Sequence, residues 1–255
     1  MSERATPPRP DGVSGGSPTE PTSEASPAPW RWYEGLAVYV LALLASVGVA
    51  VPVASLLGGG TGIVMASLLG DLVALGALLF WLNRYHRGWT RTIRFPARVG
   101  PEIWAGIAWG VGVYIAGVFV IAASIVQILV KVTDEAVRTP DQLPARLSTA
   151  AQVVVVLRAV VAAPIAEELF FRGVLFGAFR ARRAFWPSAL WSSLVFGLVH
   201  AYPGSWQGMV ALMATLGVVG LFLCVLYERR GNLVANVVAH ATFNVVGLAV
   251  LTWAG

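Results

Sequence analysis

Hydrophobic positions in this 255-residue chain form long, nearly unbroken stretches. An α-helix needs about 20 apolar residues to cross the ~30 Å hydrocarbon core of a bilayer. The stretches lie at about 34–57, 62–82, 103–130, 148–179, 186–201, 207–227 and 232–254. The fourth is longer than one span and is expected to end near its arginines, and the fifth is short. The pattern predicts an all-α fold, a polytopic transmembrane helical bundle of about seven spans.

The N-terminal segment has a different pattern. Residues 1–29 hold seven of the 15 prolines and lack an apolar stretch. Such a composition cannot bury enough apolar surface to fold, and no apolar stretch follows the first charges as it would in a signal peptide. We expect a disordered cytoplasmic tail over 1–29 and one transmembrane domain over 30–255.

Composition agrees with a membrane protein. Hydrophobic residues make up 57% of the chain and charged residues 12%, against about 25% charged in a soluble domain. The net charge of +5 comes mainly from arginines in short runs between the apolar stretches. That placement indicates membrane lipid as a partner and argues against nucleic acid. The sequence carries no signal for an oligomeric state.

The arginine runs also predict an orientation. They occupy alternate loops, at 84–98, 180–183 and 229–230, and positive charge favours the cytoplasmic side. We expect a multi-pass protein of the plasma membrane with a cytoplasmic N-terminus and an outside C-terminus. Several tryptophans near span ends, including Trp30, fit interfacial anchors.

A few polar residues interrupt the fourth, fifth and seventh stretches. Ionisable groups at the centre of a bilayer cost roughly 2.5–3.5 kcal/mol on insertion scales, so they usually have a function. At 1.5 Å of rise per residue, four of them on three helices fall in one layer near the bilayer centre. The polar residues in these stretches are Glu167, Glu168, Arg172, His200, His240 and Asn244. The four in the central layer are Glu167, His200, His240 and Asn244.

Spacing separates the roles of the two glutamates. Adjacent helical residues point about 100° apart, so Glu167 and Glu168 face different surroundings. Glu168 and Arg172 are four residues apart, the spacing of a helical ion pair, which predicts a structural role for both. Glu167 then lacks a local cationic partner and is a candidate general base or acid. The alternative is that both glutamates brace helices through Arg172 or Arg158.

Two further features belong to this candidate site. Pro164 cannot donate to the carbonyl of Val160, which predicts a kink three residues before Glu167. His240 and Asn244 lie on one helix face and are candidates to donate hydrogen bonds to an oxyanion. His200 is a candidate to position water or to move a proton.

Other chemistries stay open on these residues. Glu167, His200 and His240 are a possible zinc set, although the His-Glu-x-x-His signature is absent. Asp71 is the single aspartate within a predicted span, whereas an aspartyl mechanism needs two, and a pair with Arg158 would explain it. A proton-coupled transporter using these groups would need an inverted repeat, and none is evident.

The ordered motifs resemble the CPBP family, the type II CAAX prenyl endopeptidases and their bacterial, Abi-like relatives. Its pattern reads here as Glu167-Glu168-x-x-x-Arg172, Phe196-x-x-x-His200 and His240-x-x-x-Asn244. The resemblance covers about residues 148–250. It implies an intramembrane endopeptidase in which Glu167, assisted by His200, activates water while His240 and Asn244 stabilise the oxyanion.

The resemblance also implies a metal-free glutamate mechanism without a cofactor, with zinc as the alternative. The arginine-rich composition looks bacterial, where protein prenylation is unexpected. The expected substrate is therefore a membrane-associated protein or peptide. A different class of function is a non-catalytic scaffold or immunity protein that keeps the motifs for structure.

Overall fold

The structure is a computed structural model that describes residues 28–138, 147–202 and 204–254. All regular elements in these ranges are helices, so the predicted all-α class is confirmed. The predicted tail falls largely outside the described residues. Its last two residues are described, and Ala28 is buried.

Within the described ranges, five helical segments are long and apolar enough to cross a membrane. They are α1 (Trp32–Leu57), α2 (Gly59–Tyr85), the run from α4 (Val99–Tyr114) through η1 (Ile115–Ala122) to α5 (Ala123–Thr133), α10 (Trp206–Arg230) and α11 (Leu233–Ala254). Two of the shorter helices are α3 (Trp89–Thr92) and the 14-residue α9 (Phe185–Leu198). The chain is a multi-pass membrane protein, and the predicted count of seven spans holds roughly.

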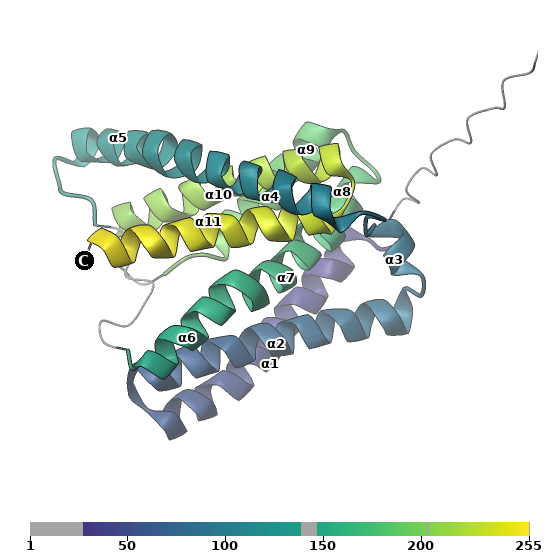
Figure 1. Ribbon diagram of the computed structural model, residues 1–255, viewed down its shortest axis with the longest axis horizontal. Coiled ribbons are helices and arrows are strands. Elements are labelled where there is room, and N and C mark those ends of the chain that lie inside the picture. Colours follow the sequence, from purple (N-terminus) through teal and green to yellow (C-terminus); the bar gives the residue numbers. More distant parts are fainter. Residues whose placement is uncertain (1–27, 139–146, 203, 255) are drawn as a thin grey trace, which may run out of the picture.

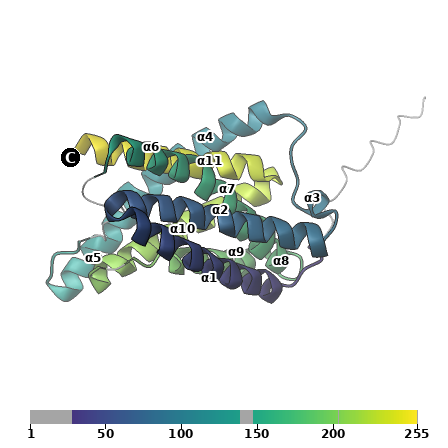
Figure 2. The ribbon, with the colours of Figure 1, turned by 90° about the horizontal axis from the view of Figure 1, so that it is seen from below.

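The predicted fourth span is one continuous helical run whose winding changes. It passes through α6 (Thr149–Leu157), the π-helical η2 (Arg158–Ala162), α7 (Ala163–Glu168), the π-helical η3 (Leu169–Phe176) and α8 (Gly177–Arg180). In Figure 1 this run lies between the α1–α2 hairpin and the group formed by α4, α10 and α11. Figure 2 shows the bundle from below, with α1 and α2 in front. The run therefore contacts both parts of the bundle.

Glycines let two helix pairs approach closely. A Cβ added to Gly110 of α4 would lie 2.4 Å from the Ala239 carbonyl oxygen of α11, and one added to Gly197 of α9 would lie 2.4 Å from the Met213 carbonyl oxygen of α10. Small residues at helix crossings are how membrane helices gain packing contacts. The α4–α11 crossing fixes the backbone next to His240.

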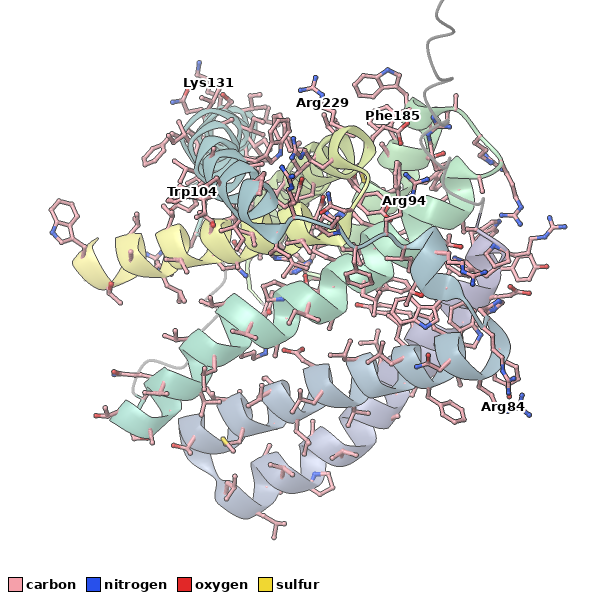
Figure 3. The ribbon with its side chains drawn as sticks, turned by 45° about the vertical axis from the view of Figure 1, so that its right-hand side comes forward. Arg84, Arg94, Trp104, Lys131, Phe185 and Arg229 are labelled. Atoms are coloured by element: carbon pink, nitrogen blue, oxygen red, sulfur yellow. The ribbon has the colours of Figure 1, made fainter. Side chains whose placement is uncertain are left out.

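The arginine-rich loops meet at one end of the bundle. Arg182 donates to the Trp30 carbonyl, and Arg180 pairs with Glu228 at 2.7 Å. Figure 3 shows Arg84 and Arg94 toward the same end, where α1 begins. Trp30 was expected at the lipid interface, but it is fully buried and its indole donates to the Val174 carbonyl at 3.0 Å. The expectation was wrong because the chain before α1 folds back onto η3.

Candidate active site

The site centres on one carboxylate oxygen of Glu167. Its Oε2 lies 3.8 Å from Nε2 of His200 and 3.8 Å from Nε2 of His240. It is buried and accepts no hydrogen bond from the described residues. Both separations exceed the usual 2.7–3.2 Å hydrogen bond, so neither Nε2 is hydrogen-bonded directly to Glu167. Helix α7, the turn that follows α9, and helix α11 thus bring the predicted residues Glu167, His200 and His240 together.

The partners of the two imidazoles fix their tautomers. The Nδ1 of His200 lies 2.7 Å from the Phe196 carbonyl, which can only accept, so this nitrogen carries the proton. The Nδ1 of His240 lies 2.8 Å from Glu168 Oε1, a carboxylate oxygen that also accepts from Arg172. In the neutral rings both Nε2 atoms therefore present lone pairs toward Glu167.

Glu168 lies at the centre of a buried hydrogen-bond network. Its Oε1 accepts from Arg172 Nη1 at 2.9 Å as well as from His240, and its Oε2 accepts from Asn236 Nδ2 at 3.2 Å. Its side chain is 0% exposed and that of Arg172 is 1% exposed. A buried charge is stable only with such partners. Glu168 therefore braces three elements and also orients His240.

Arg172 extends this network to α10. Its Nη2 donates to the Gly220 carbonyl at 3.2 Å, and its guanidinium lies 4.6 Å from the centre of the Phe196 ring. The Phe196 backbone carbonyl in turn accepts a hydrogen bond from His200 Nδ1. Arg172 thus supports both the glutamate that orients His240 and the residue that orients His200.

Asn244 has a partner that the sequence does not reveal. Its Nδ2 donates to the Ala159 carbonyl at 2.7 Å. In an α-helix that carbonyl would accept from Ala163, but the Ala163 N–H bonds to Arg158 because η2 is π-helical. The next possible donor is residue 164, a proline without an N–H. Asn244 therefore satisfies a carbonyl that the π-turn and Pro164 leave free.

The interruption at Pro164 was predicted, but with another consequence. A kink and a lost bond at the Val160 carbonyl were expected; the structure instead has a π-helical turn at 158–162, and the carbonyl with a side-chain donor is that of Ala159. Short π-helical turns often occur at functional sites. One of the two hydrogens on Asn244 Nδ2 is engaged by Ala159, which leaves the other for a ligand.

Asp71 and Arg158 form the pair that the sequence suggested. Arg158 Nε lies 2.8 Å from Asp71 Oδ2. The pair joins α2 to η2 beside the site, and its side chains are 20% and 32% exposed. Among the described residues the pair makes no hydrogen bond or ion pair with Glu167, so it lies outside the group of Glu167, His200 and His240.

A metal at this site would need a closer arrangement. Over the described ranges no three His, Cys, Asp or Glu side chains are grouped tightly enough to hold a metal ion. The 3.8 Å separations exceed the roughly 3.3 Å between ligand atoms of a tetrahedral zinc with bonds of about 2.0–2.1 Å. The nitrogen and oxygen donors are nevertheless chemically suitable, so zinc is kept as the alternative to be tested.

Comparison with known proteins assigns a family to the segment that carries these residues. Residues 149–246 match the Rce1-like family of type II CAAX prenyl endopeptidases. This Rce1-like segment, less than half of the chain, contains all seven residues of the motifs, and the resemblance seen in the sequence is confirmed. The residues before it, including α1 and α2, lie outside the match.

A second comparison finds a curated relative. An Escherichia coli protein described as an uncharacterized 24.3 kDa protein is 36% identical over 88 residues, 34% of this chain. The chain spans 39% of that relative's length. No solved structure matches the chain.

Sequence spacing does not reveal the side-chain and backbone groups that connect the motifs. Asn236, the Gly220 carbonyl and the Ala159 carbonyl hold Glu168, Arg172 and Asn244 in place, and none belongs to a motif. One signal was available for Asn236. It is a carboxamide in an apolar helix, four residues before His240 and so on the same face.

Proposed function

We propose that the protein is an intramembrane endopeptidase that hydrolyses peptide bonds of a membrane-associated protein or peptide. The observation that carries the proposal is the buried, unpartnered Oε2 of Glu167 facing Nε2 of two histidines. A carboxylate with two oriented imidazoles beside it is the set of groups needed to activate a water molecule. The Rce1-like match of 149–246 supports the same class of activity.

The chemistry can be written with every proton placed. Water held between Glu167 and His200 attacks the peptide carbonyl carbon and gives its proton to Glu167. The resulting oxyanion accepts hydrogen bonds from the free Nδ2 hydrogen of Asn244 and from His240 when Nε2 is protonated. Glu167 then gives its proton to the departing amine nitrogen as the C–N bond breaks.

The network around Glu168 supports this role for His240. The ring can donate from Nε2 only as an imidazolium, because Nδ1–H is directed at Glu168. The Glu168 carboxylate neutralises that positive charge and holds the ring orientation, as a buried aspartate does beside a catalytic histidine. Glu168 and Arg172 are structural in this scheme.

In the cell we place the protein in the plasma membrane, with the arginine-rich end and the N-terminus in the cytoplasm. The gathering of Arg84, Arg94 and Arg182 at one end supports this orientation. Membrane lipid and a membrane-associated protein or peptide are the partners, and nucleic acid is not. No cofactor is required in this proposal.

The test is cleavage of membrane peptides by the protein purified in detergent, with new N-termini read by mass spectrometry. Wild-type protein should cleave, and Glu167→Ala and His240→Ala should lose cleavage. Undiminished cleavage in both variants would contradict the proposal, and a scaffold or immunity protein predicts a phenotype independent of Glu167. Elemental analysis with chelator titration tests the mechanism. Stoichiometric zinc whose removal abolishes cleavage would show that the reaction depends on zinc and is not metal-free.

A further inference from the structure

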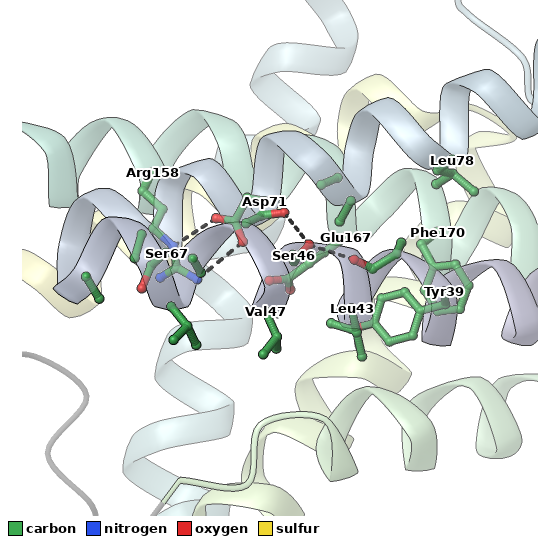
Figure 4. Close-up of a pocket in the computed structure, with 18 of the residues that line it drawn as sticks. Tyr39, Leu43, Ser46, Val47, Ser67, Asp71, Leu78, Arg158, Glu167 and Phe170 are labelled. Atoms are coloured by element: carbon green, nitrogen blue, oxygen red, sulfur yellow. Dashed lines mark hydrogen bonds and ion pairs between the residues drawn. The ribbon is translucent and has the colours of Figure 1, made fainter. Parts of the chain in front are cut away.

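A cavity of about 400 Å³ lies beside Glu167, between α1, α2 and the run from η2 to η3. Figure 4 shows Glu167 and Phe170 on one side and Tyr39, Leu43, Ser46 and Val47 of α1 on another. Of the four proposed catalytic residues, Glu167 alone lines it. The cavity therefore reaches the site at Glu167, the residue proposed to activate the attacking water.

The walls of the cavity are largely apolar, and many of the residues that form them have small side chains. Small residues of α1 and α2 face it and provide its width; they include Ala42, Ser46, Ala50, Ala66, Gly70 and Ala74. Ser46 donates to the carbonyls of Ala42 and Gly70, so its hydroxyl is already engaged. The walls suit an apolar ligand.

Apart from Glu167, the Asp71–Arg158 pair supplies the charged groups in these walls. Its geometry leaves bonding capacity unused. The 2.8 Å contact between Arg158 Nε and Asp71 Oδ2 lacks hydrogen-bond alignment, and both atoms count as buried and unbonded. Within the described ranges the pair makes one hydrogen bond, from Nη2 to Oδ1 at 3.4 Å, although a guanidinium has five N–H donors.

We infer that this cavity binds an extended apolar peptide segment of the substrate, and that Asp71 and Arg158 bind its backbone. The inference rests on the proposed function. A peptide that is unwound for cleavage exposes backbone N–H and C=O groups, which must find partners inside a membrane. Asp71 accepts from an N–H and Arg158 donates to a C=O. A hydrocarbon chain has no group that these two residues could bind, so the charges favour a peptide as occupant.

Arg158 and Glu167 lie on the same helical run, so their separation gives the distance from the ion pair to the scissile bond. Arg158 precedes Glu167 by nine residues, which corresponds to about 13 Å of helix. An extended peptide covers about 3.3 Å per residue. The ion pair therefore contacts the substrate about four residues from the scissile bond, on one side of it.

The experiment measures kcat/KM for apolar peptides shortened one residue at a time from either end, in detergent micelles. In wild-type protein, removing the fourth residue on one side should lower kcat/KM about tenfold, the order of factor expected for a hydrogen bond to a charged group. In the double variant Asp71→Leu/Arg158→Met this step should fall to about onefold. Replacing a buried ion pair by apolar residues generally preserves folding, and thermal unfolding of the variant checks this.

A matched control and a binding measurement separate the possible outcomes. Leu72→Ala, next to Asp71 but on the exposed face of α2, should keep the tenfold step. Cleavage by wild type with no step, or a step that persists in the double variant, overturns the inference and leaves the proposed function standing. Length-dependent binding to Glu167→Gln protein together with no cleavage by wild type overturns the proposed function instead.

Discussion

At the scale of single residues, two adjacent glutamates are distinguished by their partners. Glu168 accepts hydrogen bonds from Arg172, His240 and Asn236, whereas Glu167 Oε2 accepts none. The first arrangement fixes a charge in place, and the second leaves an oxygen free to take a proton from water. The same side chain therefore serves structure at one position and chemistry at the next.

Asn244 provides a test of how the site is held. Asn244→Leu leaves the Ala159 carbonyl buried without a donor, so we expect a loss of about 1–3 kcal/mol in the free energy of unfolding. In a Pro164→Ala background the new N–H can reach that carbonyl, so the same change should cost less. A double-mutant cycle by thermal unfolding in detergent measures this coupling. Additive effects of the two substitutions would contradict it.

Sequence spacing predicted a candidate site, and the structure brings Glu167, His200 and His240 of that prediction together. The spacing separated Glu167 from Glu168 by the 100° between neighbours. It could not show that Glu168 contacts His240, 72 positions away, or that Asn244 contacts Ala159, 85 positions away. Such contacts depend on how helices cross, which spacing within one helix does not determine.

At the scale of helices, the crossing of α4 and α11 controls the position of His240. Gly106 and Gly110 of α4 contact the backbone of α11 so closely that an added Cβ would lie 2.7 Å and 2.4 Å from the carbonyl oxygens of Ala235 and Ala239. These contacts are backbone atoms, which cannot move aside as a flexible side chain can. The glycines thus set the separation of the two helices.

We expect Gly110→Ala to destabilise the protein by about 1–3 kcal/mol, the usual cost of overpacking, and to lower cleavage by displacing α11. Gly112 lies on the same helix with nothing within 4 Å of an added Cβ. Gly112→Ala should therefore be neutral or stabilising by up to about 1 kcal/mol. Thermal unfolding of the two variants side by side checks the difference, and equal effects would refute the packing argument.

Hydropathy located the long helices but not their internal winding. The predicted spans 34–57 and 207–227 lie within α1 and α10. The predicted span 148–179 corresponds to the run from Thr149 to Arg180, yet nothing in its apolar pattern indicated π-helical turns at 158–162 and 169–176. A π-turn depends on which carbonyls find other donors, and for Ala159 that donor lies on α11.

At the scale of the whole molecule, the arginine-rich end is closed by contacts between distant segments. Trp30, Trp81 and His86 form an edge-to-face aromatic cluster, with the His86 ring 4.5 Å from that of Trp81 and 5.4 Å from that of Trp30. Arg182 binds the Trp30 carbonyl. The segment before α1 is thereby held against the end of α2.

This cluster predicts a pH dependence of stability. Burial lowers the pKa of His86 from its ordinary value of 6.5, and Glu34 opposes the shift only in part. The fold therefore favours the neutral ring. Its contribution to stability is present above pH 6.5 and is lost as the pH falls through that value toward the lowered pKa. His86→Phe should flatten the decline of the unfolding temperature between about pH 7.5 and 5.5; identical declines in both proteins would contradict this.

The central claim is that Glu167 activates water while Glu168 holds the site together, and one paired measurement tests it. The rate of peptide cleavage and the unfolding temperature are measured for wild type, Glu167→Gln and Glu168→Gln in the same detergent. We predict that Glu167→Gln lowers the rate by about 10²–10⁴-fold without a loss of stability. Glu168→Gln should lower stability strongly, because Arg172 and His240 lose a buried charge partner. Cleavage at the wild-type rate by folded Glu167→Gln protein would contradict the account.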